Sequence, residues 1–117
     1  MSLGGIIDCI AGFRFSYANE YQLQEGLAAA LSSRGWPVER EVRLGARDRI
    51  DLLVGSVGVE VKVAGKPDSV VRQLTRYAES DDIDALVLVT SRVRHLDLPA
   101  LINGKPVVSV SLVGAGL

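Results

Sequence analysis

Hydrophobic residues recur at helical spacing in the first third of the chain and predict a helix over residues 17–34. Ser16 or Asn19 can cap its start, and Gly35 follows as its stop. The apolar positions lie three or four residues apart, so that they share one face of the helix: Leu23, Leu27, Ala30 and Leu31. Residues 4–15, which precede this helix, mix apolar residues with glycine and predict no particular element.

Three strands are predicted next, at about residues 38–45, 48–54 and 57–64. Side chains two residues apart in a strand point to the same face of a sheet. The second and third strands therefore each have an apolar set on one face: Ile50, Leu52 and Val54, and then Val57, Val59 and Val61. The residues between these two strands read as a tight hairpin turn.

Gly55 opens the two-residue connection, and glycine in the first position is typical of a type II′ turn. If this turn closes the hairpin, Val54 pairs with Val57. Counting outward from that pair puts Asp51 directly opposite Glu60.

Two carboxylates and an ammonium group are thus predicted on one face of the hairpin. Lys62 lies two residues beyond Glu60, so the two side chains point to the same face of the strand. Asp51, opposite Glu60 in the predicted register, points to that face as well. A carboxylate pair held on rigid strands beside an ammonium suits a divalent cation and a water nucleophile. The other interpretation of residues 59–63, Val-Glu-Val-Lys-Val, is an ordinary half-exposed strand with solvated charges.

A second helix is predicted over residues 69–80, with Asp68 as its cap. Its apolar stripe consists of Val70, Val71, Leu74 and Ala78. Residues 83–90 are apolar on both faces, as is typical of a buried central strand. Residues 98–102 suggest a short helical turn, and residues 105–113 a last, valine-rich strand.

The order of these elements predicts one α/β domain over residues 1–117, a mixed β-sheet flanked by helices. Hydrophobic residues make up 48% and charged residues 23%, which is ordinary for a globular domain, and no apolar run is long enough to cross a membrane. The first Lys or Arg is Arg14, so the start of the chain lacks the charged segment of a secretory signal. Cys9 is the one cysteine, which excludes an internal disulfide and a cysteine-cluster metal site. We therefore expect a cytoplasmic protein without a membrane partner.

The net charge of −1 does not indicate a nucleic-acid-binding protein, but the charges are unevenly distributed. Residues 34–76 hold nine Lys/Arg against six Asp/Glu, whereas the remainder holds four against eight. The hairpin register also predicts Arg49 opposite Lys62, and two cations facing each other suggest an anion nearby. Phosphate groups would suit the cations of this region: Arg43, Arg47, Arg49, Lys66, Arg72 and Arg76. Ordinary solvated strand and helix charges are the alternative.

In this order of elements the chain resembles the PD-(D/E)XK nuclease superfamily, and most of all its small members such as archaeal Holliday-junction resolvases. That family has a restriction-endonuclease-like αβββαβ core, with an Asp on the second strand and Glu-X-Lys on the third. Here these are Asp51 and the Glu-Val-Lys of residues 60–62, while Ile50 stands where the family's name has Pro. The resemblance covers roughly residues 16–90.

Many members of the family add a Glu on the first helix, and helical geometry chooses between two candidates here. At about 100° per residue, Glu20 falls beside the leucine stripe that faces the sheet, whereas Glu25 falls almost opposite it. The second helix carries Gln73 and, four residues on, Tyr77, which resembles a further motif of these enzymes. Gln73 would orient the lysine or contact phosphate, and an exposed helix glutamine is the alternative.

The resemblance implies a Mg²⁺-dependent nuclease, with Mn²⁺ as a substitute for Mg²⁺. Its metal ligands would be Asp51, Glu60, the Val61 carbonyl and Glu20. Lys62 would orient the attacking water and stabilise negative charge in the transition state, with Gln73 in support. The expected activity is that of a DNA endonuclease, and branched DNA is one of the substrates that would suit the site.

The small size of the chain also predicts a homodimer, because a core of this size offers little further surface for DNA. Two other classes of function stay open. One is a catalytically inactive nuclease-fold module that binds nucleic acid or a protein partner. The other is a structural α/β domain whose hairpin charges are solvated surface, and this class predicts no metal binding.

Overall fold

The computed structural model describes residues 3–112 as an α/β structure with a mixed sheet and flanking helices. The α-helices are α1 (Leu3–Ala11), α2 (Glu20–Ser33) and α3 (Pro67–Ala78). The strands are β1 (Glu39–Arg43), β2 (Arg49–Val54), β3 (Val57–Lys62), β4 (Ala85–Thr90), β5 (Leu101–Ile102) and β6 (Lys105–Ser111). Within the described residues the strands form a six-stranded sheet in the order β1-β2-β3-β4-β6-β5. The pairs β3–β4 and β4–β6 are parallel and the others antiparallel, so the predicted mixed sheet is confirmed.

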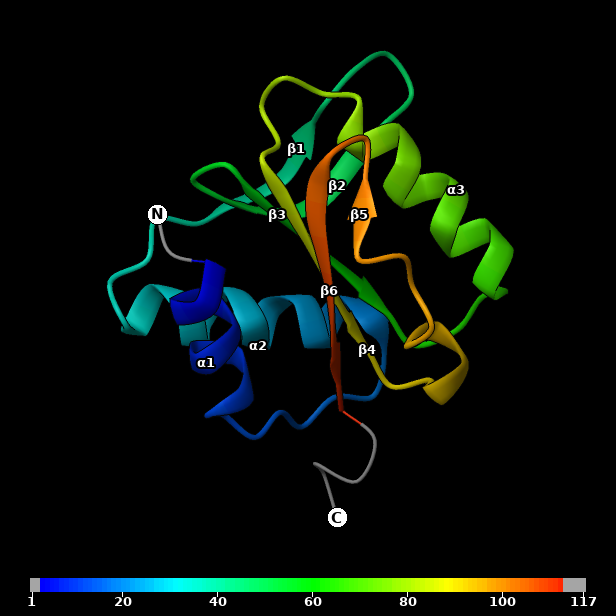
Figure 1. Cartoon of the computed structure of the whole chain (residues 1–117). Coiled ribbons are helices and arrows are strands. Elements are labelled where there is room, and N and C mark those ends of the chain that lie inside the picture. The colour runs from blue at the N-terminus through cyan, green and yellow to red at the C-terminus, as the bar shows by residue number, and fades with distance from the viewer. Residues whose placement is uncertain (1–2, 113–117) are drawn as a thin grey trace.

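The sheet separates two helical layers, with α1 and α2 on one face and α3 on the other (Figure 1). The core beneath α1 and α2 includes the leucines of α2 and one face of β3: Leu23, Leu27, Leu31, Val57, Val59 and Val61. The core beneath α3 joins Val70 and Leu74 to Leu86 and Leu88 of β4. All six residues of β4 are buried, as expected for a strand covered on both faces.

α2 begins directly after Asn19, whose side chain accepts a hydrogen bond from the Gln22 amide at 2.8 Å. This bond satisfies one of the amides that a helix start leaves without a partner, so Asn19 rather than Ser16 is the cap. Gly35 has a φ of 86°, the left-handed conformation that ends a helix. The apolar stripe predicted for this helix is buried throughout.

The β2–β3 hairpin has the predicted register, with Val54 paired to Val57 and Leu52 to Val59. Gly55 has a φ of 63°, which the first central position of a type II′ turn requires. The turn chemistry and the strand pairing were therefore readable from the local sequence alone.

Ile50 departs from the prediction that it shares a face with Leu52 and Val54. It packs in the core beneath α3, whereas Leu52 and Val54 pack beneath α1 and α2. The β1–β2 ladder skips the position at which Glu41 would face Asp51, and Glu41 has a φ of 51°. A residue in the left-handed conformation interrupts the regular alternation of a strand pair, so the period of two fails at this point.

Two predictions for the second half of the chain are wrong. α3 begins at Pro67, and Asp68 lies in its first turn instead of capping it. Proline has the φ of a helix and no amide to be satisfied, so it suits the first helical position. Residues 98–102 contain strand β5 instead of a helical turn, because Asn103 and Gly104 turn the chain back onto β6 with φ values of 53° and 74°.

The two ends of the described chain complete the fold. α1 occupies part of residues 4–15, for which the sequence predicted no element, and packs against α2. The last strand, expected over residues 105–113, is observed as β6, and residue 113 lies outside the described residues. No helix among residues 3–112 is long and apolar enough to span a lipid bilayer.

Candidate active site

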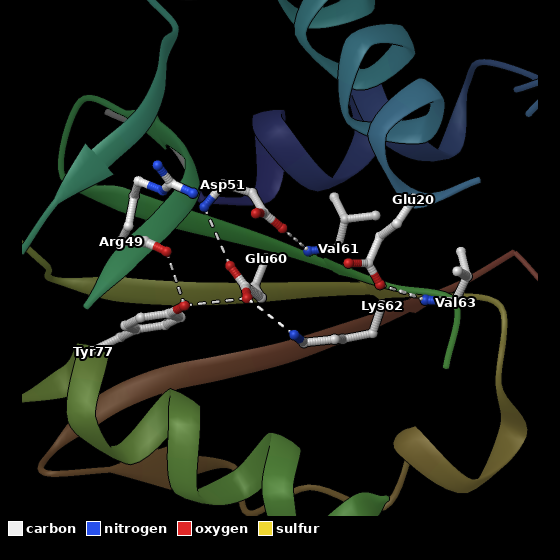
Figure 2. A network of polar contacts seen from close by, with 8 residues as sticks. All are labelled: Glu20, Arg49, Asp51, Glu60, Val61, Lys62, Val63 and Tyr77. Carbon is white, nitrogen blue, oxygen red and sulfur yellow. Dashed lines mark hydrogen bonds and ion pairs between the residues drawn. The ribbon is translucent and has the colours of Figure 1, made fainter. Parts of the chain in front are cut away.

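Glu60 brings a carboxylate into the interior of the sheet, where the residue is 2% exposed. Its Oε1 accepts a hydrogen bond from the Asp51 amide at 3.2 Å, and Asp51 Oδ2 in turn accepts one from the Val61 amide at 2.8 Å (Figure 2). The regular β2–β3 pairs end before this point, so side-chain carboxylates take the place of backbone carbonyls as acceptors. The predicted proximity of Asp51 and Glu60 is observed, in the form of this reciprocal exchange.

Lys62 lies on the same face of β3 as Glu60 and supplies the positive charge nearest to it. Its Nζ is 3.4 Å from Glu60 Oε2, and its side chain is 20% exposed. Among the described residues, one other ion pair is present, between Arg76 and Asp48. The expected grouping of two carboxylates with one ammonium is therefore a feature of this structure (Figure 2).

Burial changes the protonation of the carboxylate pair. It raises the pKa of Glu60 to about 8, and the neighbouring Asp51 carboxylate adds to the rise while Lys62 opposes it. Burial also raises the pKa of Asp51 above its ordinary value, against the hydrogen bond from the Val61 amide. With this pKa, Glu60 mostly holds a proton at neutral pH when no cation is bound, so its contact with Lys62 is a full ion pair only at higher pH. A bound cation would displace that proton.

Tyr77 of α3 contacts the carboxylate pair from the other side. Its ring is buried, and its hydroxyl lies 3.2 Å from Glu60 Oε2 and 3.1 Å from the Arg49 carbonyl. Burial and the neighbouring carboxylates raise the pKa of Tyr77 above its ordinary value, so the hydroxyl keeps its proton and can donate. Sequence reasoning chose Gln73 from this helix, although Tyr77 follows Val70 and Leu74 at the spacing of the buried stripe.

Gln73 itself is half-buried and lines a neighbouring pocket instead of contacting Lys62. A buried tyrosine needs a partner for its hydroxyl, and this rule would have favoured Tyr77 as the residue that reaches the site. Among residues 3–112 the polar partner of the Lys62 ammonium is Glu60, so the predicted role of Gln73 in orienting the lysine stays a prediction. Its place in the pocket agrees with the alternative role, contact with phosphate.

Glu20, the first residue of α2, reaches the end of β3. Its Oε1 accepts a hydrogen bond from the Val63 amide at 3.0 Å (Figure 2). Glu25, by contrast, is exposed. The prediction that Glu20 and not Glu25 faces the sheet is confirmed. Glu20 also lines a cavity of about 160 Å³ together with Asp51 and Glu41, a residue that the sequence did not single out.

The fit of a divalent cation depends on the oxygen donors near Glu60. Residues 3–112 contain no group of three or more Asp, Glu, His or Cys side chains arranged to hold a metal ion, so Glu20 does not complete such a group. Mg²⁺ in proteins is bound by one or two carboxylates and keeps several waters. Asp51, Glu60 and the adjacent Val61 carbonyl are oxygen donors of the kind that Mg²⁺ requires.

A basic pocket of about 400 Å³ lies between the β1–β2 connection and α3. Its lining residues are Arg43, Arg47, Asp48, Arg49, Gln73, Arg76 and Tyr77. Two of the cations predicted to contact phosphate, Lys66 and Arg72, do not line this pocket. Lys66 directly precedes α3, and Arg72 donates a hydrogen bond to Ser69. The structure thus gathers four of the six predicted arginines and lysines in one place.

Arg49 faces a different cation from the one expected. It pairs with Arg43 across β1 and β2, whereas the β2–β3 pairs end before they would bring it opposite Lys62. The hydrogen bonds between Asp51 and residues 60–61 replace the ladder there. The prediction that Arg49 faces Lys62 is therefore wrong, and the cation opposite Arg49 is Arg43.

His95 follows β4 and is buried. Its Nε2 donates to the Gly65 carbonyl at 2.8 Å, because a carbonyl oxygen can only accept. Its Nδ1 lies 2.8 Å from the Thr90 hydroxyl, which can donate to it, and the same hydroxyl oxygen accepts a hydrogen bond from the Arg92 amide. His95 therefore ties the loop that follows Lys62 to the end of β4.

Comparison of the chain with protein-family models, with curated proteins and with solved structures finds no match. The resemblance to PD-(D/E)XK nucleases therefore stays a prediction from motif and element order. The geometry around Glu60 and the basic pocket is what supports a function for the chain.

Proposed function

We propose that the chain is a metal-dependent phosphodiesterase that cleaves nucleic acid, and specifically a DNA endonuclease with a restriction-endonuclease-like core. The observation that carries this proposal is the grouping of Asp51, Glu60 and Lys62, with Lys62 Nζ 3.4 Å from Glu60 Oε2. The succession of α2, β1, β2, β3, α3 and β4 agrees with an αβββαβ core. The basic pocket beside Tyr77 adds a surface for the phosphate backbone.

Asp51, Glu60 and the Val61 carbonyl would hold Mg²⁺, with Mn²⁺ as a substitute. Bound Mg²⁺ would lower the pKa of a coordinated water and neutralise charge on the reacting phosphate. Glu20 keeps its place on the Val63 amide and adds negative charge near Asp51.

Lys62 and Tyr77 act through their contacts with Glu60. The Lys62 ammonium would orient the attacking water and stabilise the negative charge that develops on the phosphate oxygens. The Tyr77 hydroxyl holds Glu60 in one orientation, because it approaches Oε2 while the Asp51 amide approaches Oε1. A carboxylate fixed at both oxygens is a preorganised ligand.

Cleavage of supercoiled plasmid and of a four-way junction in Mg²⁺ or Mn²⁺ tests this function. We expect the native chain to cleave DNA, and Lys62→Ala and Asp51→Asn to lose at least about a hundredfold in rate. Asp82→Asn, at an exposed position before β4, is the matched control and should cleave at the native rate. Absence of cleavage, or cleavage that survives both site substitutions, would contradict the proposal.

A second candidate is a nuclease-like module that binds nucleic acid without cleaving it. The specific observation in its favour is that the described residues lack a three-ligand metal group while the basic pocket is fully formed. Calorimetry with Mg²⁺ and Mn²⁺ separates the two candidates. If the native chain binds DNA but binds neither metal ion, the non-cleaving module is favoured.

A further inference from the structure

The basic pocket holds an excess of positive charge that the protein itself does not neutralise. Four of its seven lining residues are arginines and one is an aspartate. Arg76 Nε donates to Asp48 Oδ1 at 2.9 Å, so that aspartate is already paired. Arg43, Arg47 and Arg49 have no carboxylate within ion-pair distance in the part of the chain that the structure describes.

Two of these unpaired arginines face each other directly. Arg43 on β1 pairs with Arg49 on β2, and like charges in directly opposed positions of antiparallel strands destabilise the pair. Both side chains also line the pocket, together with Arg47 from the connection between the strands. A bound anion would remove this repulsion, so the arrangement is suited to a protein that works with an anion in place.

The chemistry of the lining points to a phosphate group as that anion. Each guanidinium presents a planar fork of donors that can bind two oxygens of a phosphate. Three such forks can share the several oxygens of a tetrahedral phosphate, whereas a carboxylate offers two oxygens in one plane. Gln73 adds a neutral amide donor to the same wall, and no aliphatic side chain lines the pocket.

The pocket is also connected to the candidate active site through one side chain. Tyr77 lines the pocket and its hydroxyl lies 3.2 Å from Glu60 Oε2. Arg49 lines the pocket as well, and its carbonyl lies 3.1 Å from the same hydroxyl. A phosphate in the pocket would therefore lie next to the carboxylate pair, separated from it by the Tyr77 ring.

We propose that Arg43, Arg47 and Arg49 form a phosphate-binding pocket that holds one phosphate group of a nucleic-acid strand without a metal ion. The identity of the strand as the one being cleaved rests on the proposed function, whereas the binding itself does not. The phosphate is either an internal phosphodiester or a terminal phosphate of the strand. The pocket has a volume of about 400 Å³, which falls within the range of sites for small organic ligands. Part of a nucleotide therefore fits in the pocket together with the phosphate.

The test measures binding of a short, 3′-labelled DNA oligonucleotide by fluorescence anisotropy in EDTA. We expect Arg47→Ala and Arg43→Ala each to weaken binding about fivefold or more, and each to reduce the slope of log K against log salt by about one. Arg14→Ala removes the same charge on the opposite side of the sheet, next to Phe13 and Phe15, and should bind within about twofold of the native chain. Equal loss in Arg14→Ala, or no loss in the pocket variants, would overturn the proposal.

Two arms of the experiment distinguish the sources of the phosphate. Equal affinity for oligonucleotides with a 5′-hydroxyl and a 5′-phosphate would identify an internal phosphodiester as the ligand. Tighter binding of the 5′-phosphorylated oligonucleotide, lost in Arg47→Ala, would identify a terminal phosphate. Binding of inorganic phosphate without arginine-dependent binding of either oligonucleotide would overturn the assignment to a nucleic-acid strand.

Failure of this proposal can be told apart from failure of the proposed function. Arginine-dependent binding in EDTA, without cleavage in Mg²⁺, would support the phosphate pocket and refute the nuclease. Cleavage in Mg²⁺ at the native rate by Arg43→Ala and Arg47→Ala, with unchanged affinity in EDTA, would refute the pocket and leave the nuclease. Thermal melting controls for folding, since removal of Arg43 relieves its repulsion with Arg49 and should not lower the melting temperature.

Discussion

Glu60 is an acid whose ordinary pKa of 4.5 rises to about 8 in the folded chain, chiefly because it is buried. A raised pKa in the folded state means that the fold binds the proton more tightly than the unfolded chain does. The stability that the proton confers is fully present below about pH 4.5 and is lost as the pH rises through 8. Asp51 shifts in the same direction and adds to this loss.

The first prediction concerns this pH dependence. In EDTA, the free energy of unfolding of the native chain should fall between about pH 5 and pH 9, with a slope of up to about 1.4 kcal/mol per pH unit. Glu60→Gln keeps the shape of the side chain and removes its proton equilibrium, so its curve should be flatter. Urea denaturation of both proteins across this range measures the difference. Two parallel curves would show that Glu60 does not titrate as described.

The second prediction concerns Tyr77. Its hydroxyl lies within hydrogen-bond distance of Glu60 Oε2, which is buried, and of the Arg49 carbonyl, which is partly buried. Tyr77→Phe should lower the free energy of unfolding by about 1–2 kcal/mol and reduce the cleavage rate more than the DNA affinity. Tyr17→Phe, at a half-buried residue that packs against the core beneath α1 and α2, is the matched control and should change neither quantity. Equal effects of the two substitutions would show that the Tyr77 hydroxyl has no particular role at the candidate site.

Glu41 is the residue for the third prediction, because a non-glycine residue with a φ of 51° within a strand is strained. Glu41→Gly should raise the free energy of unfolding by up to about 1 kcal/mol, since glycine adopts this conformation without steric cost. Glu39→Gly on the same strand should lower it by about 0.5–1 kcal/mol, because glycine weakens regular strands. Urea denaturation gives both values. If Glu41→Gly lowered the free energy of unfolding more than Glu39→Gly does, the interpretation of Glu41 as a strained residue would be wrong.

The β2–β3 hairpin is the element that carries the site, and Gly58 shows how closely it is packed. A Cβ at Gly58 would collide with Ile50 Cδ1 and would lie 3.0 Å from side-chain carbons of Ile83 and Leu86. Ile50 reaches this position because the β1–β2 ladder is interrupted where Glu41 would face Asp51, and beyond this point Ile50 faces α3. The absence of a side chain at Gly58 therefore makes room for the residue that precedes the first carboxylate of the site.

The fourth prediction follows from this contact between neighbouring strands. Gly58→Ala should lower the free energy of unfolding by about 1–3 kcal/mol and displace Ile50. Gly45→Ala is the matched control, because nothing lies within 4 Å of its Cβ position and its φ is not positive, so it should be neutral or slightly stabilising. Thermal or urea unfolding compares the two. If Gly58→Ala left the free energy of unfolding unchanged, the hairpin would accommodate a methyl group at this position without cost.

At the scale of the whole molecule, the charges of opposite sign are separated in space. The net charge is −1, yet the pocket between the β1–β2 connection and α3 is basic, and the cavity beside α2 has three carboxylates on its wall. The carboxylate pair lies between these two regions, at the β2–β3 hairpin. A nucleic-acid phosphate and a cation would thus approach Glu60 from different sides.

The fifth prediction concerns the cation. A ligand that binds only the folded state stabilises it by about 2.7 kcal/mol at a hundred times its Kd. We expect Mg²⁺ or Mn²⁺ to raise the melting temperature of the native chain, and to do so more at pH 8 than at pH 6, where Glu60 holds its proton. Asp51→Asn should show no such rise. A melting temperature that does not respond to either metal would identify the hairpin charges as structural.

Local sequence determined much of this protein. Gly35 stops α2, the glycine-first turn sets the hairpin register, and the apolar run of residues 83–90 contains a strand buried on both faces. The same local rules placed Glu20, but not Glu25, toward the sheet. These features follow from the sequence because caps, turns and periodicity depend on residues within a few positions of one another.

Tertiary structure alone decided which distant residues meet. The face that Ile50 occupies, the approach of Tyr77 instead of Gln73 to Glu60, the pairing of Arg43 with Arg49 and the burial of His95 were not read from the sequence. Each depends on a contact between segments that lie apart in the chain or on a local distortion such as that at Glu41. Local patterns specify faces and ends of elements, whereas the partner across a face is set by how whole elements pack, and the chemistry of this site lies in those partners.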